Sequence, residues 1–218
     1  MSLRAAAVVA MLLLSGCGHF VDVQSSLNTY RDAPSVASLA DLPSETLPYP
    51  TEVTFSIDEH SPVFEFPETG KSFIKIFALP AATTDYRLVV RSYILRDGLF
   101  GGALFYPLVT FLDAGKTPIA TSSRQSLQMV AGSFFNEPDE PNRLQFAALM
   151  TPQNPARYIV IHTSRTLIEF GMRDAEPARV QLAATTYVPM YIPMDTTPRH
   201  MPGSPVGYLK ITLGPPRT

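Results

Sequence analysis

The stretch Tyr86–Leu95, YRLVVRSYIL, decides how the chain folds. Its β-branched and aromatic residues suit the pleated surface of a β-strand. It is the strongest strand candidate in the sequence, and the segments around it have a similar composition over shorter lengths.

Further strand candidates lie on both sides of this stretch. Val53–Ile57 alternates apolar and polar residues with the period of a half-buried strand. The other predicted strands are Phe64–Phe66, Phe73–Leu79, Leu104–Leu112, Pro118–Thr121, Leu144–Met150, Arg157–Thr163, Val180–Val188 and Val206–Leu213. About nine to eleven short strands joined by polar turns predict an all-β fold, a single antiparallel β-sandwich of jelly-roll-like style over residues 51–218.

Few helices are expected. The chain contains 21 prolines and only 17% charged residues, a composition that disfavours long helices. A short helix is expected near Leu127–Ser133 or Thr166–Met172. Strands do not alternate with helical segments, which argues against a nucleotide-binding α/β fold.

Charge and cysteine content exclude several classes of function. The net charge is −2, and the 17 lysines and arginines form no cluster, so nucleic-acid binding has no electrostatic basis. The single cysteine, Cys17, excludes intrachain disulfides and cysteine-based zinc sites.

The N-terminus carries an export signal. Arg4 precedes the apolar run Ala5–Leu14, and this order is typical of a secretory signal peptide. The run is about half the roughly 20 residues needed to cross a bilayer. The next residues, Leu14-Ser15-Gly16-Cys17, resemble the lipobox of bacterial lipoproteins. That resemblance implies a signal peptide over residues 1–16 and acylation of Cys17, and Gly18 favours sorting to the outer membrane.

Residues 17–50 are interpreted as a lipidated, flexible tether. They are poor in charge, contain several serines and prolines, and scatter their apolar residues. Two alternatives stay open here: a short helix over Val36–Leu42, and packing of part of the tether on the domain.

Catalytic and metal-binding motifs are not recognisable. The sequence lacks a nucleophile elbow, a zinc-protease helix and a phosphate-binding glycine loop. His60 and Ser61 lie in an acidic turn, but proximity in sequence does not make a catalytic pair. His162 ends a predicted strand and is expected to be structural. The acidic segment Asn136–Asn142 is read as a solvated turn, with a calcium loop as the alternative.

Four segments and the C-terminal tail resemble the maltose operon periplasmic protein (MalM) family. The segments are SFIKIFALPA, YRLVVRSYIL, ALFYPLVTFLDAGKTPIA and RYIVIHTS, and the tail carries Pro198-Arg199-His200 followed by Gly207-Tyr208-Leu209-Lys210-Ile211. The similarity runs over about residues 62–213, and the chain resembles a lipoprotein variant without the family's C-terminal extension. The resemblance implies an envelope protein associated with carbohydrate uptake, without enzymatic activity or cofactor.

Candidate binding residues lie near the C-terminus. Arg199 and His200 fall in a proline-rich loop that could bind a ligand or a partner, or could simply be pinned to the domain. Tyr187 and Tyr191 are candidates for a sugar platform. Strand tyrosines such as Tyr93 and Tyr106 are more often residues of the core edge.

Two main functional hypotheses result. The first is a non-enzymatic lipoprotein of the outer membrane, facing the periplasm and accessory to maltodextrin-type uptake or envelope glycan handling. Its partners would be the membrane, through its lipid, and an oligosaccharide or an envelope transporter or porin protein. The second is a structural or assembly lipoprotein that binds another envelope protein and no sugar. A hydrolase is a third, weaker hypothesis.

Overall fold

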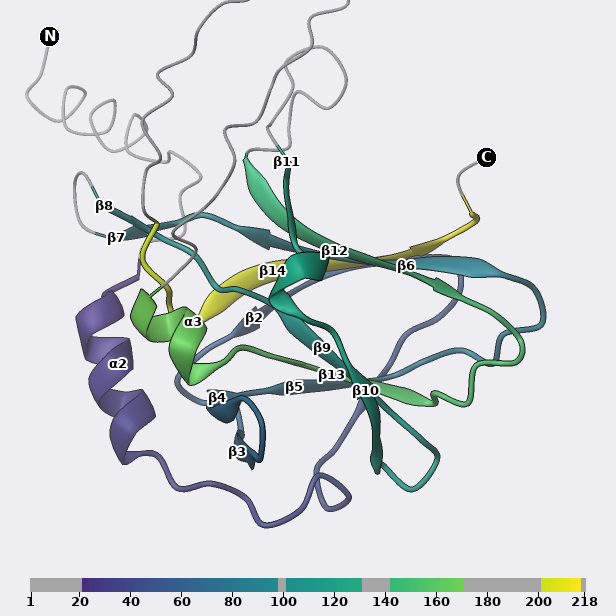
Figure 1. The fold of residues 1–218 in the computed structure, drawn as a ribbon, viewed down its shortest axis with the longest axis horizontal. Coiled ribbons are helices and arrows are strands. Elements are labelled where there is room, and N and C mark those ends of the chain that lie inside the picture. Colours follow the sequence, from purple (N-terminus) through teal and green to yellow (C-terminus); the bar gives the residue numbers. More distant parts are fainter. Residues whose placement is uncertain (1–20, 98–100, 131–141, 171–200, 217–218) are drawn as a thin grey trace, which may run out of the picture.

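The computed structural model describes residues 21–97, 101–130, 142–170 and 201–216 (Figure 1). Two five-stranded sheets pack face to face. Sheet I has the strand order β1 (Glu45–Thr46), β5 (Lys75–Ala78), β13 (Tyr158–His162), β9 (Leu108–Leu112) and β10 (Pro118–Thr121). Sheet II has the order β11 (Gln128–Val130), β12 (Arg143–Met150), β6 (Tyr86–Tyr93), β14 (Gly207–Gly214) and β2 (Thr51–Ile57).

Shorter elements surround the two sheets. They are the β3 (Val63–Phe66)–β4 (Gly70–Phe73) and β7 (Leu95–Asp97)–β8 (Gly101–Ala103) ladders, the helices α2 (Val23–Asp32) and α3 (Arg165–Phe170), and the 3₁₀ turn η1 (Arg124–Ser126). Among the strands of the described residues, every pair is antiparallel except β1 with β5. The predicted all-β sandwich is therefore confirmed.

Strand β6 occupies the middle of sheet II, as the sequence of Tyr86–Leu95 predicts. It pairs with β12 on one side and with β14 on the other. Leu88 and Val90 point into the core and are fully buried, while Arg87 and Arg91 stand on the opposite face. The alternation of side chains in this strand thus assigns one face of sheet II to the core.

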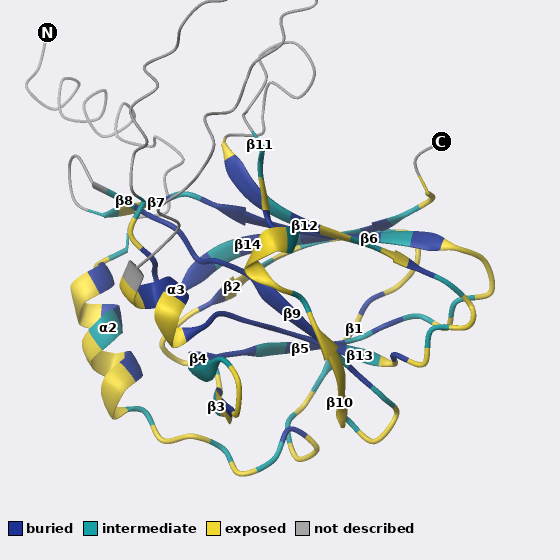
Figure 2. Cartoon of the chain, viewed as in Figure 1, coloured by how far each residue is buried: buried dark blue, intermediate teal, exposed yellow. Residues whose placement is uncertain are grey.

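Aromatic contacts join the two sheets across the core. Phe55 of β2 meets Phe77 of β5 edge to face, with ring centroids 4.9 Å apart. Phe111 of β9 and Phe146 of β12 are tilted at 6.4 Å. These rings come from opposite sheets, and Figure 2 shows buried residues along the strands of both layers. The core therefore depends on contacts between residues far apart in the sequence.

Residues 21–50 correct the expectation of a flexible tether, since they pack on the sandwich. Tyr30 of α2 is only 6% exposed, and its hydroxyl donates to the carbonyl of Lys71 at 2.6 Å. Leu39 joins a second apolar cluster on the outside of sheet I, and β1 adds a strand to that sheet. The alternative, that part of the segment 17–50 packs on the domain, therefore applies to residues 21–50. Residues 1–20, with the predicted signal peptide and Cys17, lie outside the described residues.

The predicted helix over Val36–Leu42 is wrong, because Val36 donates its backbone N–H to Val63 at 2.7 Å and bridges to β3 instead. The helix expected near Thr166–Met172 is confirmed as α3. At Leu127–Ser133 the chain instead begins β11.

Two predicted strands are shorter in the structure. Phe73–Leu79 is divided at Ile74, whose N–H bonds to the carbonyl of Pro62. Leu104–Leu112 forms a strand only from Leu108, because Leu104 bridges to Gly203. The predicted strand Val180–Val188 lies outside the described residues. In the part of the chain described here, no helix has the length and apolar character needed to cross a membrane.

Candidate functional site

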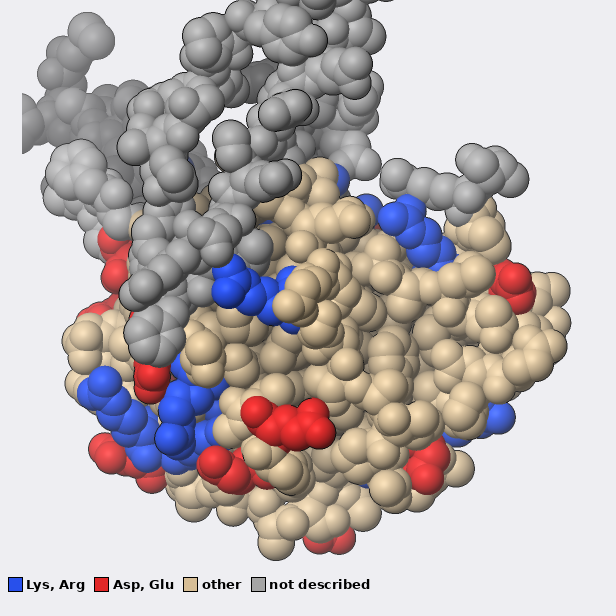
Figure 3. Space-filling model, in the orientation of Figure 1, with Lys and Arg blue, Asp and Glu red and all other residues tan. Residues whose placement is uncertain are grey.

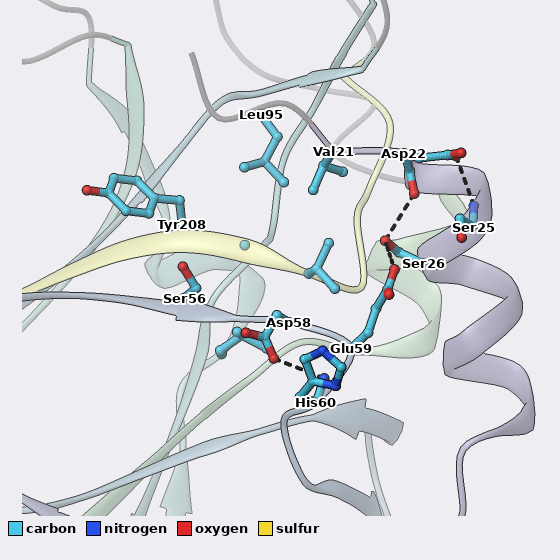
Figure 4. A pocket seen from close by; sticks show the side chains of 13 residues that line it. Val21, Asp22, Ser25, Ser26, Ser56, Asp58, Glu59, His60, Leu95 and Tyr208 are labelled. Carbon is cyan, nitrogen blue, oxygen red and sulfur yellow. Dashed lines mark hydrogen bonds between the residues drawn. The ribbon is translucent and has the colours of Figure 1, made fainter. Parts of the chain in front are cut away.

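A polar cleft of about 400 Å³ lies where the start of α2 meets the end of β2 (Figure 4). Helix α2, the turn after β2, β7 and the start of β14 surround it. The side chains that line it and carry polar atoms belong to Asp22, Ser25, Ser26, Ser56, Asp58, Glu59, His60 and Tyr208, and apolar walls come from Val21, Ile57, Leu95 and Val206.

The first turn of α2 forms one side of the cleft. Asp22 is the N-cap residue, and its carboxylate accepts a hydrogen bond from the backbone N–H of Ser25 at 3.0 Å. An aspartate in this position satisfies a helix N–H that has no partner within the helix. This cap fixes where α2 begins and turns Ser25 and Ser26 toward the cleft.

Ser26 connects α2 to the turn after β2. Its Oγ lies 2.7 Å from Oε1 of Glu59 and 3.0 Å from the carbonyl oxygen of Asp22. A serine hydroxyl has one proton to donate, so the two acceptors share it. This contact links residues 33 positions apart in the sequence and holds the carboxylate of Glu59 at the rim of the cleft.

The turn after β2 forms the opposite side. One carboxylate oxygen of Asp58 accepts from the backbone N–H of His60 at 3.0 Å and from the hydroxyl of Ser61 at 3.2 Å, while the Asp58 N–H donates to Ser61 Oγ. These bonds give His60 and Ser61 structural roles in the turn. The hydroxyl of Ser61 bonds to Asp58 and not to the imidazole of His60, so the two do not form a nucleophile–base pair.

The carboxylates of Asp22, Asp58 and Glu59 each use a single oxygen in these contacts: Oδ1, Oδ1 and Oε1 respectively. Within the described residues the second oxygen of each has no hydrogen-bond donor and remains able to accept one. The ring of Tyr208 stands at the far end of the cleft from Asp22 (Figure 4). Among the described residues, no lysine or arginine lines the cleft. Hydrogen-bond acceptors and a tyrosine that line the same cleft suit a neutral ligand rich in hydroxyl groups.

Metal binding at this cleft lacks support. Among the residues that the structure describes, no group of three or more His, Cys, Asp or Glu side chains is arranged to hold a metal ion. The acidic segment Asn136–Asn142, the calcium alternative of the sequence, lies outside the described residues except for Asn142.

His162 is structural, as its position at the end of a strand predicts. The imidazole is fully buried, its Nδ1 lies 2.9 Å from the carbonyl oxygen of Thr163, and its Nε2 lies 2.8 Å from Oγ1 of Thr110. Burial, opposed by the bond to Thr163, lowers the pKa of His162 to about 4. The histidine is therefore neutral in the folded protein at physiological pH.

The predicted ligand residues Tyr187, Tyr191, Arg199 and His200 lie outside the described residues, as does the predicted lipidation site Cys17.

The two strand tyrosines named from the sequence are found in the described part. Tyr106 lies outside any strand. Its side chain is buried, and its hydroxyl donates a hydrogen bond to the carbonyl of Met201 at 2.8 Å. Tyr93 of β6 lies 5.9 Å from the ring of Tyr208.

Sequence reasoning identified the acidic turn Asp58–Ser61 but missed its partners on α2. The available signal was Asp22, a residue type favoured at the N-cap, immediately before the helix. Tyr208 was visible only as part of the C-terminal strand. Nothing local in the sequence indicates that this strand begins beside the first turn of α2.

Comparison with known proteins gives one match. A family model described as maltose operon periplasmic protein precursor (MalM) matches residues 69–213, which are 145 of the 218 residues. The matched region runs from just before β4 to the penultimate residue of β14 and contains Tyr208, whereas Asp22, Asp58 and Glu59 precede it. Comparisons with curated proteins and with solved structures give no match.

Proposed function

This chain belongs to the maltose operon periplasmic protein family, and from that premise we propose that it binds a neutral oligosaccharide of the maltodextrin type in the cleft beside α2. It would act as a non-enzymatic accessory protein of carbohydrate uptake in the bacterial envelope. The family supplies the link to the maltose operon and the periplasm, and the cleft supplies the chemistry of the ligand.

The observation that carries this proposal is the state of the three carboxylates. Asp22, Asp58 and Glu59 each use one oxygen in a hydrogen bond to the protein and line a cleft that has no lysine or arginine among its described lining residues. Carboxylate oxygens accept hydrogen bonds from sugar hydroxyls, and a tyrosine ring offers an apolar face to the sugar. The same negative charge repels phosphorylated and acidic sugars.

Isothermal titration of the full chain with maltotriose tests the proposal. We expect saturable binding that weakens at least about tenfold in Glu59→Gln, which loses the second acceptor oxygen, and in Tyr208→Ala, which loses the ring. Glu59→Gln keeps an oxygen that can accept from Ser26, so the turn should stay in place.

The matched control is Asp85→Asn, which removes a carboxylate from an exposed position just before β6. Its affinity for maltotriose should equal that of the unchanged chain. An unchanged chain that binds neither maltotriose nor longer maltodextrins would contradict the proposal, and so would an equal loss in Asp85→Asn.

The proposed location is the periplasmic face of the outer membrane, with the chain anchored through lipid on Cys17. The lipobox-like sequence before Cys17 and Gly18 after it support this location. Cys17→Ser should abolish incorporation of labelled palmitate and release the protein from the membrane fraction. Unchanged fractionation and labelling would rule out the anchor while leaving the sugar site untouched.

A second candidate function, binding of another envelope protein, is favoured by strand β10. All four of its residues are exposed at the edge of sheet I, and the side chain of Ile119 is 45% exposed. An exposed edge strand can pair with a strand of another protein. A stoichiometric protein partner that is crosslinked to the chain, lost in Ile119→Lys and unaffected by maltodextrin would establish this alternative.

A further inference from the structure

A second pocket, of about 280 Å³, lies between the last turn of α2 and α3 and has the opposite charge. Arg31 of α2, Lys71 of β4 and Arg165 of α3 line it together with Tyr30, and Glu169 is the one acidic residue among its described lining residues. Figure 3 shows lysine and arginine side chains gathered over this part of the surface. Three cations thus converge from three separate elements on one small hollow.

These cations form no close ion pair with the described residues. In the described part of the chain, no carboxylate lies within 4.0 Å of the charged groups of Arg31, Lys71 or Arg165. The ammonium group of Lys71 instead donates to the carbonyl oxygen of Arg31 at 2.9 Å and lies 5.7 Å from the centre of the Tyr30 ring. Glu65, opposite Lys71 in the β3–β4 ladder, and Glu169 offset part of this positive charge. The remaining positive charge favours an anion between the three cations.

The buried Tyr30 holds the cluster in place. Its hydroxyl donates to the backbone carbonyl of Lys71 at 2.6 Å. Burial raises the pKa of Tyr30, and the nearby charge of Arg165 opposes that rise. Tyr30 therefore ties down Lys71 and lies beside Arg165, and Arg31 follows directly in the same helix. A pocket whose donors are already placed loses less entropy on binding.

From this arrangement we propose that Arg31, Lys71 and Arg165 form a binding site for a phosphate group. Two guanidinium groups and an ammonium group match the oxygens of phosphate in charge and in hydrogen-bonding geometry. The phosphate could belong to free inorganic phosphate or to the headgroup of a phospholipid, since both present the same oxygens. The site is separate from the cleft proposed to bind a neutral sugar, which lies at the other end of α2.

Thermal unfolding of the full chain tests the site, with inorganic phosphate compared with chloride at equal ionic strength. We expect phosphate to raise the melting temperature. The double variant Arg31→Gln/Arg165→Gln should bind phosphate at least about a hundredfold more weakly, since each lost charge-assisted contact weakens binding about tenfold. Arg157→Gln is the matched control, because Arg157 is exposed and its side chain bonds only to local backbone carbonyls.

A second arm distinguishes the lipid source. The Cys17→Ser chain, in which an acyl group at residue 17 cannot contribute, is mixed with vesicles of phosphatidylglycerol and, separately, of phosphatidylcholine. Binding to either vesicle that disappears in Arg31→Gln/Arg165→Gln would assign the site to lipid headgroups. If neither phosphate nor vesicles bind, or if Arg157→Gln weakens binding as much as the double variant, the phosphate site is refuted.

Discussion

The imidazole of His162 stacks on the ring of Phe66, with ring centroids 4.0 Å apart and planes inclined by 18°. A carbonyl oxygen can only accept, so Nδ1 carries the proton that is donated to Thr163, and Nε2 accepts from the hydroxyl of Thr110. The hydroxyl of Thr110 in turn accepts from Thr121. This chain of bonds joins β13, β9 and β10 through a neutral histidine.

The first prediction concerns stability at acidic pH. Burial lowers the pKa of His162 to about 4 from its ordinary value of 6.5, so the unfolded chain binds a proton in this interval that the folded chain excludes. The stability contributed by neutral His162 is complete above pH 6.5 and is lost as the pH falls toward 4. The loss should amount to roughly 3 kcal/mol.

Urea unfolding between pH 8 and pH 4 measures this loss. His162→Gln, which cannot take up a proton, should flatten the pH dependence across the interval, whereas the exposed His60 can be changed to glutamine without that effect. An unchanged slope in His162→Gln would show that another group dominates acid unfolding.

The second prediction concerns Gly203, which lies against α3. A Cβ at this position would stand 2.0 Å from the carbonyl oxygen of Leu167 and 2.6 Å from Cα of Ile168. Both are backbone atoms, which cannot move aside by a rotamer change. Gly203→Ala should therefore destabilise the protein by about 3 kcal/mol or more.

Gly214 provides the control, because a Cβ there meets nothing within 4 Å. Chemical denaturation should place Gly214→Ala within about 0.5 kcal/mol of the unchanged chain. Equal midpoints for the two alanine variants would mean that the segment around Gly203 moves away from α3 without cost.

The strand pattern was predictable because it is local. In Tyr86–Leu95 the side-chain alternation and the β-branched residues point to one structure, and β6 forms nearly as expected. The division of Phe73–Leu79 was not predictable, because it depends on a hydrogen bond from Ile74 to Pro62, and Pro62 lies outside that segment. The residue pattern within a segment cannot show where the chain changes from pairing with one strand to pairing with another.

The packing of residues 21–50 illustrates the same limit. Their few apolar side chains resemble those of a linker, yet Tyr30 meets Phe73 edge to face at 5.9 Å, and Leu47 is buried. The candidate cleft is assembled from α2, the turn after β2 and β14. Ser26 of α2 and Glu59 of the turn are 33 positions apart in the sequence, and β14 lies farther along the chain. Only the acidic turn itself was visible in the sequence.

The third prediction tests the docking of α2 through Tyr30. Tyr30→Phe removes the hydroxyl that donates to Lys71 at 2.6 Å but keeps the ring against Phe73. We expect a loss of about 1 kcal/mol, and a loss of roughly 3–5 kcal/mol for Tyr30→Ala, which also removes the ring. If Tyr30→Ala unfolds at the same urea concentration as the unchanged chain, α2 does not contribute to the stability of the domain.

The fourth prediction concerns the contact that closes one end of the candidate cleft. Ser26 and Glu59 are in direct contact at 2.7 Å, so their effects on stability should not add. Ser26→Ala and Glu59→Ala should each cost about 1 kcal/mol, and the double variant should cost less than their sum by at least about 0.5 kcal/mol. A double-mutant cycle in urea measures this coupling energy, with Asp85→Ala in place of Glu59→Ala as the uncoupled pair. Strict additivity for Ser26 and Glu59 would show that apolar packing alone holds α2 against the turn, and the carboxylate of Glu59 would then be free to leave the cleft.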